Sequence, residues 1–404
     1  MRRENGYRIL PGRLMSDNCE LCRQEALDCV YQPDRSTRGL KVYLCRHCGL
    51  VQSLPRLARA PRAVATVSSG ADWGNVRYGK GFRTKAALDA LARHADLSTA
   101  LKLLDVGSNR GSFAKSFLDA APGAHVTAVE PDERFYQSCA GLPRTDLIHG
   151  RIENVTLESG QFDIVHSCHT IEHLADPMRA LKDHARCLKP GGILVMDAPN
   201  LALVGGDDIL EEWFIDKHLY HFTARTLSRM IEAAGFTILQ QPDPDDLINL
   251  LFVAKNNGRP ADAIAPDVAE VDAAENLVAA YIASRARNLA ALTQVAAELK
   301  SFGNKRIALW GAGRLFDSLV LHGNFDTSSL SLLIDTHLKA HVGERHGVAL
   351  ATPDALDAHQ PDIIVVMSRG FADEIVAEAK QRCPAAQILL YGDLISRARM
   401  RQAA

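Results

Sequence analysis

The chain has 404 residues, of which 47% are hydrophobic and 23% are charged, and its formal net charge is −2. A chain of this length exceeds what one hydrophobic core usually supports, so two or three domains are expected. The near-neutral charge predicts no broad basic surface for nucleic acid or for an anionic membrane. No apolar run approaches the roughly 18–20 residues that cross a bilayer, and the start, MRRENGYRILPGRL, lacks the apolar stretch of a secretory signal.

Two CxxC pairs lie within residues 1–57, and they consist of Cys19, Cys22, Cys45 and Cys48. Each pair places two thiolates at a tight turn, and two such turns can close a tetrahedral zinc site, in which His47 could replace one ligand. Four unrelated free thiols remain an alternative, and a redox role is disfavoured because neither pair opens a thioredoxin-like helix. Nine cysteines in all indicate a reducing, cytoplasmic setting. We expect a zinc-ribbon-like domain with a structural Zn²⁺.

Residues 58–257 alternate between strand and helix patterns. The expected strands are LKLLDVG, HVTAVEP, FDIVHSCH and GGILVMDAP, and helical stretches such as SFAKSFLDAA and DPMRALKDHARCL separate them. This alternation predicts an α/β domain with a parallel, doubly wound, Rossmann-like sheet. Ligands of such sheets bind beyond the carboxyl ends of the strands, which here are residues 105–111, 130–131 and 166–173.

Residues 258–404 begin with a polar break, NNGRPADAIAPD, and a long amphipathic helix is expected over 271–302. The segments KRIALWGAGRLFDSLVL, LSLLID, GVAL, PDIIVVMS and AQILLYG then predict a second, smaller α/β domain. Gly311 and Gly313 form a glycine turn there, and Asp335 follows the second strand as a ribose-binding acid would. Whether this turn binds a nucleotide remains open.

The segment LLDVGSNRGSF carries the first glycine turn, at Gly107 and Gly111. Such turns bring bare backbone close to a ligand, and NAD, FAD and S-adenosylmethionine are all candidates. A dinucleotide site favours G-x-G-x-x-G, which is absent here. Asn109 replaces a glycine, and asparagine tolerates positive φ better than most residues. Glu130 ends the next strand and suits the ribose of NAD and S-adenosylmethionine equally.

The segments FDIVHSCHTIEHLADP, CLKPGGILVMDAPN and DKHLYHFTARTLSRMIEAAGF occur in order. Together they resemble the class I S-adenosylmethionine-dependent methyltransferases over most of residues 78–257. Within that class, GSNRG resembles the turn of the sugar C-methyltransferases, which also have an N-terminal four-cysteine zinc domain and a C-terminal Rossmann-like domain. The resemblance implies a zinc-binding domain, a methyltransferase domain and a substrate-framing domain over 1–57, 58–257 and 258–404.

The resemblance also implies the residues of a cofactor site. The matching positions are Asp105, Gly107, Ser108, Asn109, Gly111, Glu130, Pro131, Ile152 and His169. HGRIEN matches the segment around the adenine, where Arg151 replaces a frequent acidic residue, so the backbone near Ile152 is expected to read the base. His169 and His173 fall where the sugar C-methyltransferases have an asparagine and a histidine.

His218 matches the final histidine of the HEH stretch in those enzymes, although Lys217 replaces its glutamate. Methyl transfer to a hydroxyl or an enolisable carbon requires removal of a proton, and a histidine of ordinary pKa, about 6.5, is partly neutral at working pH. His218 is therefore the first candidate for a general base, with His173 and His221 as further candidates. Tyr220 and Tyr78 are weaker ones. For each of these residues, helix capping, core packing or loop anchoring is the alternative role.

The expected function is methylation of a nucleotide-linked keto sugar, or of a related small molecule, at carbon or at oxygen. An RNA base methyltransferase is an alternative, because zinc ribbons also precede such domains, but the charge and the lack of a basic aromatic patch disfavour it. A non-catalytic binding module that retains the cofactor fold is another alternative. We expect no nucleic-acid or membrane partner, and we expect the zinc and cofactor sites to lie in separate hydrophobic cores. The sequence indicates no oligomeric state.

Overall fold

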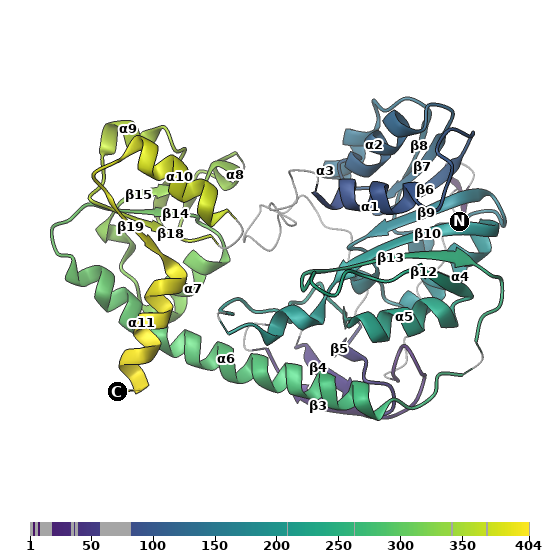
Figure 1. Cartoon of the computed structure of the whole chain (residues 1–404), viewed down its shortest axis with the longest axis horizontal. Coiled ribbons are helices and arrows are strands. Elements are labelled where there is room, and N and C mark those ends of the chain that lie inside the picture. Colours follow the sequence, from purple (N-terminus) through teal and green to yellow (C-terminus); the bar gives the residue numbers. More distant parts are fainter. Residues whose placement is uncertain are drawn as a thin grey trace. The chain divides into compact units, whose positions relative to one another are not determined.

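The structure is a computed structural model. It describes residues 18–33, 36, 39–56, 82–207, 209–261, 263–340, 342–368 and 371–403, together with the backbone of two short paired strands, β1 (Arg3–Glu4) and β2 (Tyr7–Arg8). Tyr78 lies outside the described residues. The described residues form two compact units (Figure 1). The first comprises residues 18–56, 82–205 and 214–279, and the second comprises 206–213 and 280–403.

A seven-stranded sheet organises the first unit. Its strands are β6 (Lys102–Val106), β7 (His125–Glu130), β8 (Thr145–His149), β9 (Phe162–Cys168), β10 (Leu188–Pro199), β12 (Phe236–Gln240) and β13 (Asn249–Asn256), in the order β12-β13-β10-β9-β6-β7-β8. The five strands β6 to β10 are parallel, but β13 is antiparallel to both neighbours. The four strands expected from the sequence, β6, β7, β9 and β10, are parallel as predicted, but the sheet as a whole is mixed. Only residues 241–248 join β12 to β13, and a parallel pair requires a longer crossover.

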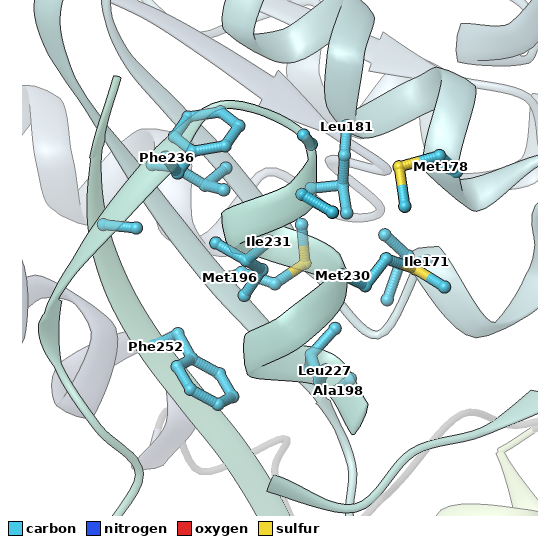
Figure 2. Packing of buried hydrophobic residues seen from close by; sticks show 14 of the residues in the cluster. Ile171, Met178, Leu181, Met196, Ala198, Leu227, Met230, Ile231, Phe236 and Phe252 are labelled. Carbon is cyan, nitrogen blue, oxygen red and sulfur yellow. The ribbon is translucent and has the colours of Figure 1, made fainter. Parts of the chain in front are cut away.

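Helices cover both faces of this sheet, as expected of a doubly wound fold. The helices are α1 (Phe82–Ala92) and α2 (Ser112–Ala120) on one face, and α4 (Pro177–Cys187) and α5 (Ala224–Ala233) on the other. Alternate residues of β10 pack against the helices on opposite faces of the sheet. Val195 lies in one hydrophobic cluster with Phe117, and Met196 lies in the other with Leu181 and Met230 (Figure 2). The alternation of side chains along a strand explains why β10 is apolar throughout.

The sequence sets where these helices begin. Asp176 caps α4 by accepting a hydrogen bond from the backbone of Arg179, and Pro177 occupies the first helical position. Thr223 and Thr226 form a reciprocal capping box at the start of α5. The shorter elements are α3 (Glu133–Tyr136) and the 3-10 turns Gln137–Cys139, Ile152–Asn154, Ile171–His173 and Leu201–Gly205.

The N-terminal strands belong to the same unit. β3 (Leu27–Tyr31), β4 (Lys41–Cys45) and β5 (Val51–Leu54) form an antiparallel sheet whose fourth strand, β11 (Tyr220–His221), comes from the methyltransferase-like region. Cys19 and Cys45 are buried in the same hydrophobic cluster as Met196 and Phe222. The expectation of separate cores is therefore wrong. A module of about 40 residues rarely buries enough apolar surface to fold without a metal or a partner surface. The boundaries at residues 57 and 257 remain predictions.

The second unit contains the predicted α/β arrangement. Its strands are β14 (Ile307–Trp310), β15 (Leu330–Ile334), β16 (Glu344–Arg345), β17 (Val348–Ala351), β18 (Ile363–Val366) and β19 (Gln387–Leu390), in the order β16-β17-β15-β14-β18-β19, and only β16 pairs antiparallel. Its helices are α7 (Arg314–Gly323), α8 (Thr336–Lys339), α9 (Ala355–His359), α10 (Ala372–Arg382) and α11 (Tyr391–Ala403).

The long helix expected over 271–302 is α6 (Val268–Ser301), which contributes residues to both units. Despite its length, it is too polar to span a bilayer, and no other helix in the described part of the chain is both long and apolar enough to do so.

Candidate active site

The first glycine turn joins β6 to α2, and three of its residues have left-handed backbone: φ is 71° at Gly107, 49° at Asn109 and 73° at Gly111. The expected positive φ of Asn109 is confirmed. A Cβ at Gly107 would lie 2.3 Å from Thr170 Oγ1, and one at Gly111 would lie 2.8 Å from Cys139 Sγ. Packing within the protein therefore already requires both glycines, in addition to any approach of a ligand.

Glu130 holds this turn in place. Its buried carboxylate accepts a hydrogen bond from the backbone N–H of Asn109 at 2.7 Å and one from that of Asp132 at 2.7 Å. Burial raises the pKa of Glu130, and the two backbone donors act against that shift. A carboxylate has about four acceptor positions, so two remain for the hydroxyl groups of a ribose. Pro131, between the two bonded segments, is exposed.

Asp105 and Ser108 flank the turn on its buried side. The ring N–H of His166 donates from Nδ1 to Asp105 Oδ1 at 2.7 Å, and the His166 ring stacks on Phe113 with centroids 3.6 Å apart. Asp105 Oδ2 is buried and has no hydrogen-bond partner among the described residues. Ser108 Oγ lies 3.7 Å from Cys139 Sγ. The sequence placed His166 at the ligand edge but did not identify it as the partner of Asp105.

Ile152 begins a 3-10 turn that follows β8 and packs against the core of the first unit. The preceding Gly150 donates its N–H to the carbonyl of Glu130 at 3.1 Å, so this segment lies beside the end of β7. Arg151 donates to Glu153 at 2.7 Å and to the carbonyl of His173 at 3.3 Å. The candidate adenine segment is thereby tied to both Glu130 and the histidine-containing turn.

Four side chains meet beyond the end of β9, and we refer to them as the histidine–glutamate cluster: His169, Glu172, His173 and His218. Glu172 Oε1 lies 3.4 Å from His173 Nε2 and 3.8 Å from His169 Nδ1. The rings of His173 and His218 have centroids 4.9 Å apart. The N–H of Leu219 donates to the backbone carbonyl of Glu172 at 2.8 Å, which joins the two segments.

Burial dominates the electrostatics of this cluster. It lowers the pKa of His169 and that of His218 well below the ordinary value, and nearby basic side chains, Arg83 for His169 and His173 for His218, add to the effect. Burial also raises the pKa of Glu172 to about 8, although Arg83 and Lys217 act in the opposite direction. The lowered pKa of His218 favours its neutral form, which can accept a proton, and it also makes the ring a weaker base than an ordinary histidine.

The sequence did not single out Glu172, although it lies beside His173. Its side chain is 1% exposed, and neither carboxylate oxygen has a hydrogen-bond partner in the described part of the chain. Asp197 was missed too: its Oδ2 lies 3.8 Å from His169 Nε2, and burial raises its pKa to about 6. Burial and not sequence pattern distinguishes these carboxylates from the many surface ones.

His221 and Tyr220 lie on β11. His221 Nε2 is 2.9 Å from Ser53 Oγ on β5, the side chain is buried, and this burial lowers its pKa to about 3. The hydroxyl of Tyr220 donates to the carbonyl of Ala175 at 2.9 Å. The structure thus gives both residues partners outside the histidine–glutamate cluster, and we leave them out of the proposed catalytic group.

The four N-terminal cysteines lie together and are all buried. Cys19 Sγ is 3.5 Å from Cys48 Sγ, and Cys22 Sγ is 3.6 Å from Cys45 Sγ. Sulfur atoms bound tetrahedrally to zinc at about 2.3 Å lie about 3.8 Å apart, so the spacing fits a zinc site. The group of candidate ligands contains the four sulfurs without His47.

The second glycine turn, in the second unit, is packed tightly. A Cβ at Gly311, where φ is 114°, would lie 2.6 Å from the carbonyl oxygen of Met367. Asp335 accepts hydrogen bonds from the backbone of Ala312 at 3.0 Å and from that of Leu338 at 2.9 Å. The carboxylate therefore connects the turn to the cap of α8. Nucleotide binding by this turn remains untested.

Residues 80–241 match the family model described as a methyltransferase domain. The chain is 30% identical over 152 residues to a ubiquinone biosynthesis O-methyltransferase from Maricaulis maris, a match that covers 33% of this chain and 59% of that relative. It is 29% identical over 138 residues to a "Probable S-adenosylmethionine-dependent methyltransferase" from Mycolicibacterium smegmatis, covering 34% of this chain and 52% of that relative.

The chain thus spans little more than half the length of these curated relatives. Among solved structures, an S-adenosylmethionine-dependent methyltransferase from Mesorhizobium loti aligns with a TM-score of 0.36 and 18% identity, over 42% of this chain and 97% of that one. The family match identifies residues 80–241 as a methyltransferase domain, and the relative from Mycolicibacterium smegmatis is named as dependent on S-adenosylmethionine.

Proposed function

We propose that the chain transfers a methyl group from S-adenosylmethionine to a small molecule, with a nucleotide-linked keto sugar as the first candidate. One observation carries the proposal: the glycine turn and the histidine–glutamate cluster share one edge of the sheet. Thr170, between His169 and Glu172, lies directly against Gly107. A ligand held by the turn therefore lies next to neutral histidines that can accept a proton.

The residues at this edge fit the cofactor. When bound, S-adenosylmethionine supplies a methyl group carried on a cationic sulfonium. Asp105 Oδ2, Asp197 Oδ1 and both oxygens of Glu172 are buried without a hydrogen-bond donor in the described part of the chain. A cationic ligand suits such acceptors, because burial makes an uncompensated carboxylate costly. Glu130 would hold the ribose, and the backbone of the Gly107–Gly111 turn would hold the methionine part.

His218 is proposed as the general base. The lowered pKa keeps its ring neutral, so that a ring nitrogen can take the proton from the substrate as the new bond forms. His173 belongs to the same cluster, with its ring fixed by a 2.7 Å hydrogen bond to the carbonyl of Lys217. Transfer to oxygen and transfer to carbon are both compatible with this arrangement. The relative from Maricaulis maris is named an O-methyltransferase, which favours oxygen.

A structural Zn²⁺ on Cys19, Cys22, Cys45 and Cys48 is part of the proposal. Two pairs of sulfur atoms are 3.5 and 3.6 Å apart, which supports a site closed by four thiolates. The four cysteines form a group separate from the histidine–glutamate cluster, which supports a structural and not a catalytic role.

Labelled methyl transfer onto a panel of nucleotide sugars, in keto and reduced forms, tests the activity. On the accepted substrate, His218→Ala should lower kcat by about 10²–10⁴-fold, the usual share of a general base, while cofactor affinity changes only slightly. His125, exposed at the amino end of β7, offers a matched control, since His125→Ala should leave kcat unchanged. An unchanged kcat in His218→Ala contradicts the assignment. Deuterium exchange at the α-carbon of a keto sugar, with S-adenosylhomocysteine bound, indicates C-methylation.

A further inference from the structure

Glu172 is a buried carboxyl group in an unusual environment, and its neighbours come from several elements. The titratable and charged groups around it are His169 and His173 on its own segment, Cys168 at the end of β9, Arg83 on α1, Asp197 on β10, and Lys217 and His218 before β11. Arg83 and Lys217 are basic and Asp197 is acidic, so the surroundings do not impose a single charge state on Glu172.

The tautomer of His173 indicates where a proton lies. Its Nδ1 is 2.7 Å from the carbonyl oxygen of Lys217, and a carbonyl only accepts, so Nδ1 carries the hydrogen. In the neutral ring, Nε2 then has a lone pair, and it faces Glu172 Oε1 at 3.4 Å. A lone pair opposite an ionised carboxylate is repulsive. A single proton placed between Oε1 and Nε2 would relieve this repulsion.

The cofactor turn is in direct contact with this segment. Thr170 Oγ1 lies 2.3 Å from the position that a Cβ of Gly107 would occupy, and the Thr170 hydroxyl is 3.3 Å from the carbonyl oxygen of Val106 at the end of β6. A positive charge held by the turn therefore lies close to the Glu172–His173 pair. A nearby cation favours the ionised form of a carboxyl group, and the low dielectric of a buried site strengthens that effect.

We propose that Glu172 is a charge-coupled proton acceptor that releases its shared proton when the cationic cofactor binds and recovers one during turnover. The inference rests on the proposed function. On binding, one proton passes to solvent and leaves Glu172 as a carboxylate. During transfer, the substrate forms its bond to the methyl group, the methyl–sulfur bond breaks with its electron pair remaining on sulfur, and the substrate proton passes to His218. The proton then moves from His218 to Glu172, whose ligand atoms lie within 4.8 Å of each other, and Glu172 returns to its protonated form as the cofactor loses its positive charge.

Isothermal titration calorimetry in buffers of different ionisation enthalpy tests this coupling. The observed binding enthalpy varies linearly with the ionisation enthalpy of the buffer, and the slope gives the number of protons released on binding. At pH 7, S-adenosylmethionine should release on the order of one proton more than neutral S-adenosylhomocysteine does. Subtracting the two removes any contribution of Glu130, which meets the ribose of both ligands. Sinefungin, whose ammonium replaces the sulfonium, should behave like S-adenosylmethionine. Equal proton counts for the charged and neutral ligands overturn the inference, whereas failure of all three to bind overturns the proposed function instead.

Variants locate the proton. Glu172→Gln should abolish the difference between the two ligands, while Glu158→Gln, at an exposed glutamate, should preserve it. A difference that survives in Glu172→Gln and disappears in Asp197→Asn overturns the assignment to Glu172. The affinity ratio provides a second measurement on the unaltered protein: from pH 8.5 to 6.5, S-adenosylmethionine should weaken relative to S-adenosylhomocysteine by roughly tenfold. A divalent cation found by metal analysis beyond the zinc, and lost in Glu172→Gln, would overturn the proton assignment.

Discussion

Replacing Gly107 by alanine tests why the first residue of the turn is a glycine. The new Cβ would lie 2.3 Å from Thr170 Oγ1, and the residue would retain a φ of 71°. The left-handed backbone costs a non-glycine residue about 1–2 kcal/mol, and overpacking typically costs about 1–3 kcal/mol. We therefore expect Gly107→Ala to lower the free energy of unfolding of the first unit by about 2–5 kcal/mol.

Two further variants separate these contributions. Gly160 has a φ of 63° and no atom within 4 Å of the place that a Cβ would occupy, so Gly160→Ala should cost only about 1–2 kcal/mol. Thr170→Ala should cost about 1 kcal/mol for the hydrogen bond that its hydroxyl shares between the carbonyls of Val106 and Cys168. Combined with Gly107→Ala, it removes the clashing oxygen, so the double variant should be about 1–3 kcal/mol more stable than additivity predicts.

Urea-induced unfolding followed by circular dichroism measures these changes, and hydrogen exchange in the segment 103–118 locates them. Two results would refute the reasoning. One is a Gly107→Ala variant no less stable than Gly160→Ala. The other is strict additivity of Gly107→Ala and Thr170→Ala, which would show that the turn avoids Thr170 by a backbone shift and that the glycine is not required by this contact.

Three other predictions concern metal, cofactor and pH. Cys45→Ser should remove the proposed zinc and also weaken cofactor binding, because Cys45 shares a core with the sheet; zinc analysis and calorimetry check this, and unaltered cofactor affinity would contradict it. Glu130→Ala should weaken binding of S-adenosylmethionine by about 1.5–3 kcal/mol in calorimetry, and an unchanged affinity would remove Glu130 from the site. Burial lowers the pKa of His184 to about 4, below the unfolded value of about 6.5, so its contribution to stability falls by about 3 kcal/mol as the pH drops from 6.5 to 4. His184→Leu should flatten the dependence of the thermal-unfolding temperature on pH in this range, and identical profiles for the two proteins would contradict the claim.

The sequence alone predicted the features that depend on local spacing. The turn at Gly107, the positive φ of Asn109 and the four cysteines all follow from residues close together in the chain. Strands β6, β7, β9 and β10 were equally readable, since a buried parallel strand is a short apolar run bounded by turn residues.

Tertiary structure alone decided which distant segments meet. β13 runs antiparallel because it follows β12 closely, and β11 joins the N-terminal sheet although more than 160 residues separate it from β5. This pairing merges two expected cores into one. Glu172 was overlooked because nothing in its sequence context distinguishes it from a surface glutamate. Burial beside His173, with Lys217 fixing the tautomer of that ring, gives Glu172 its chemistry, and burial is a property of the folded chain and not of any local pattern.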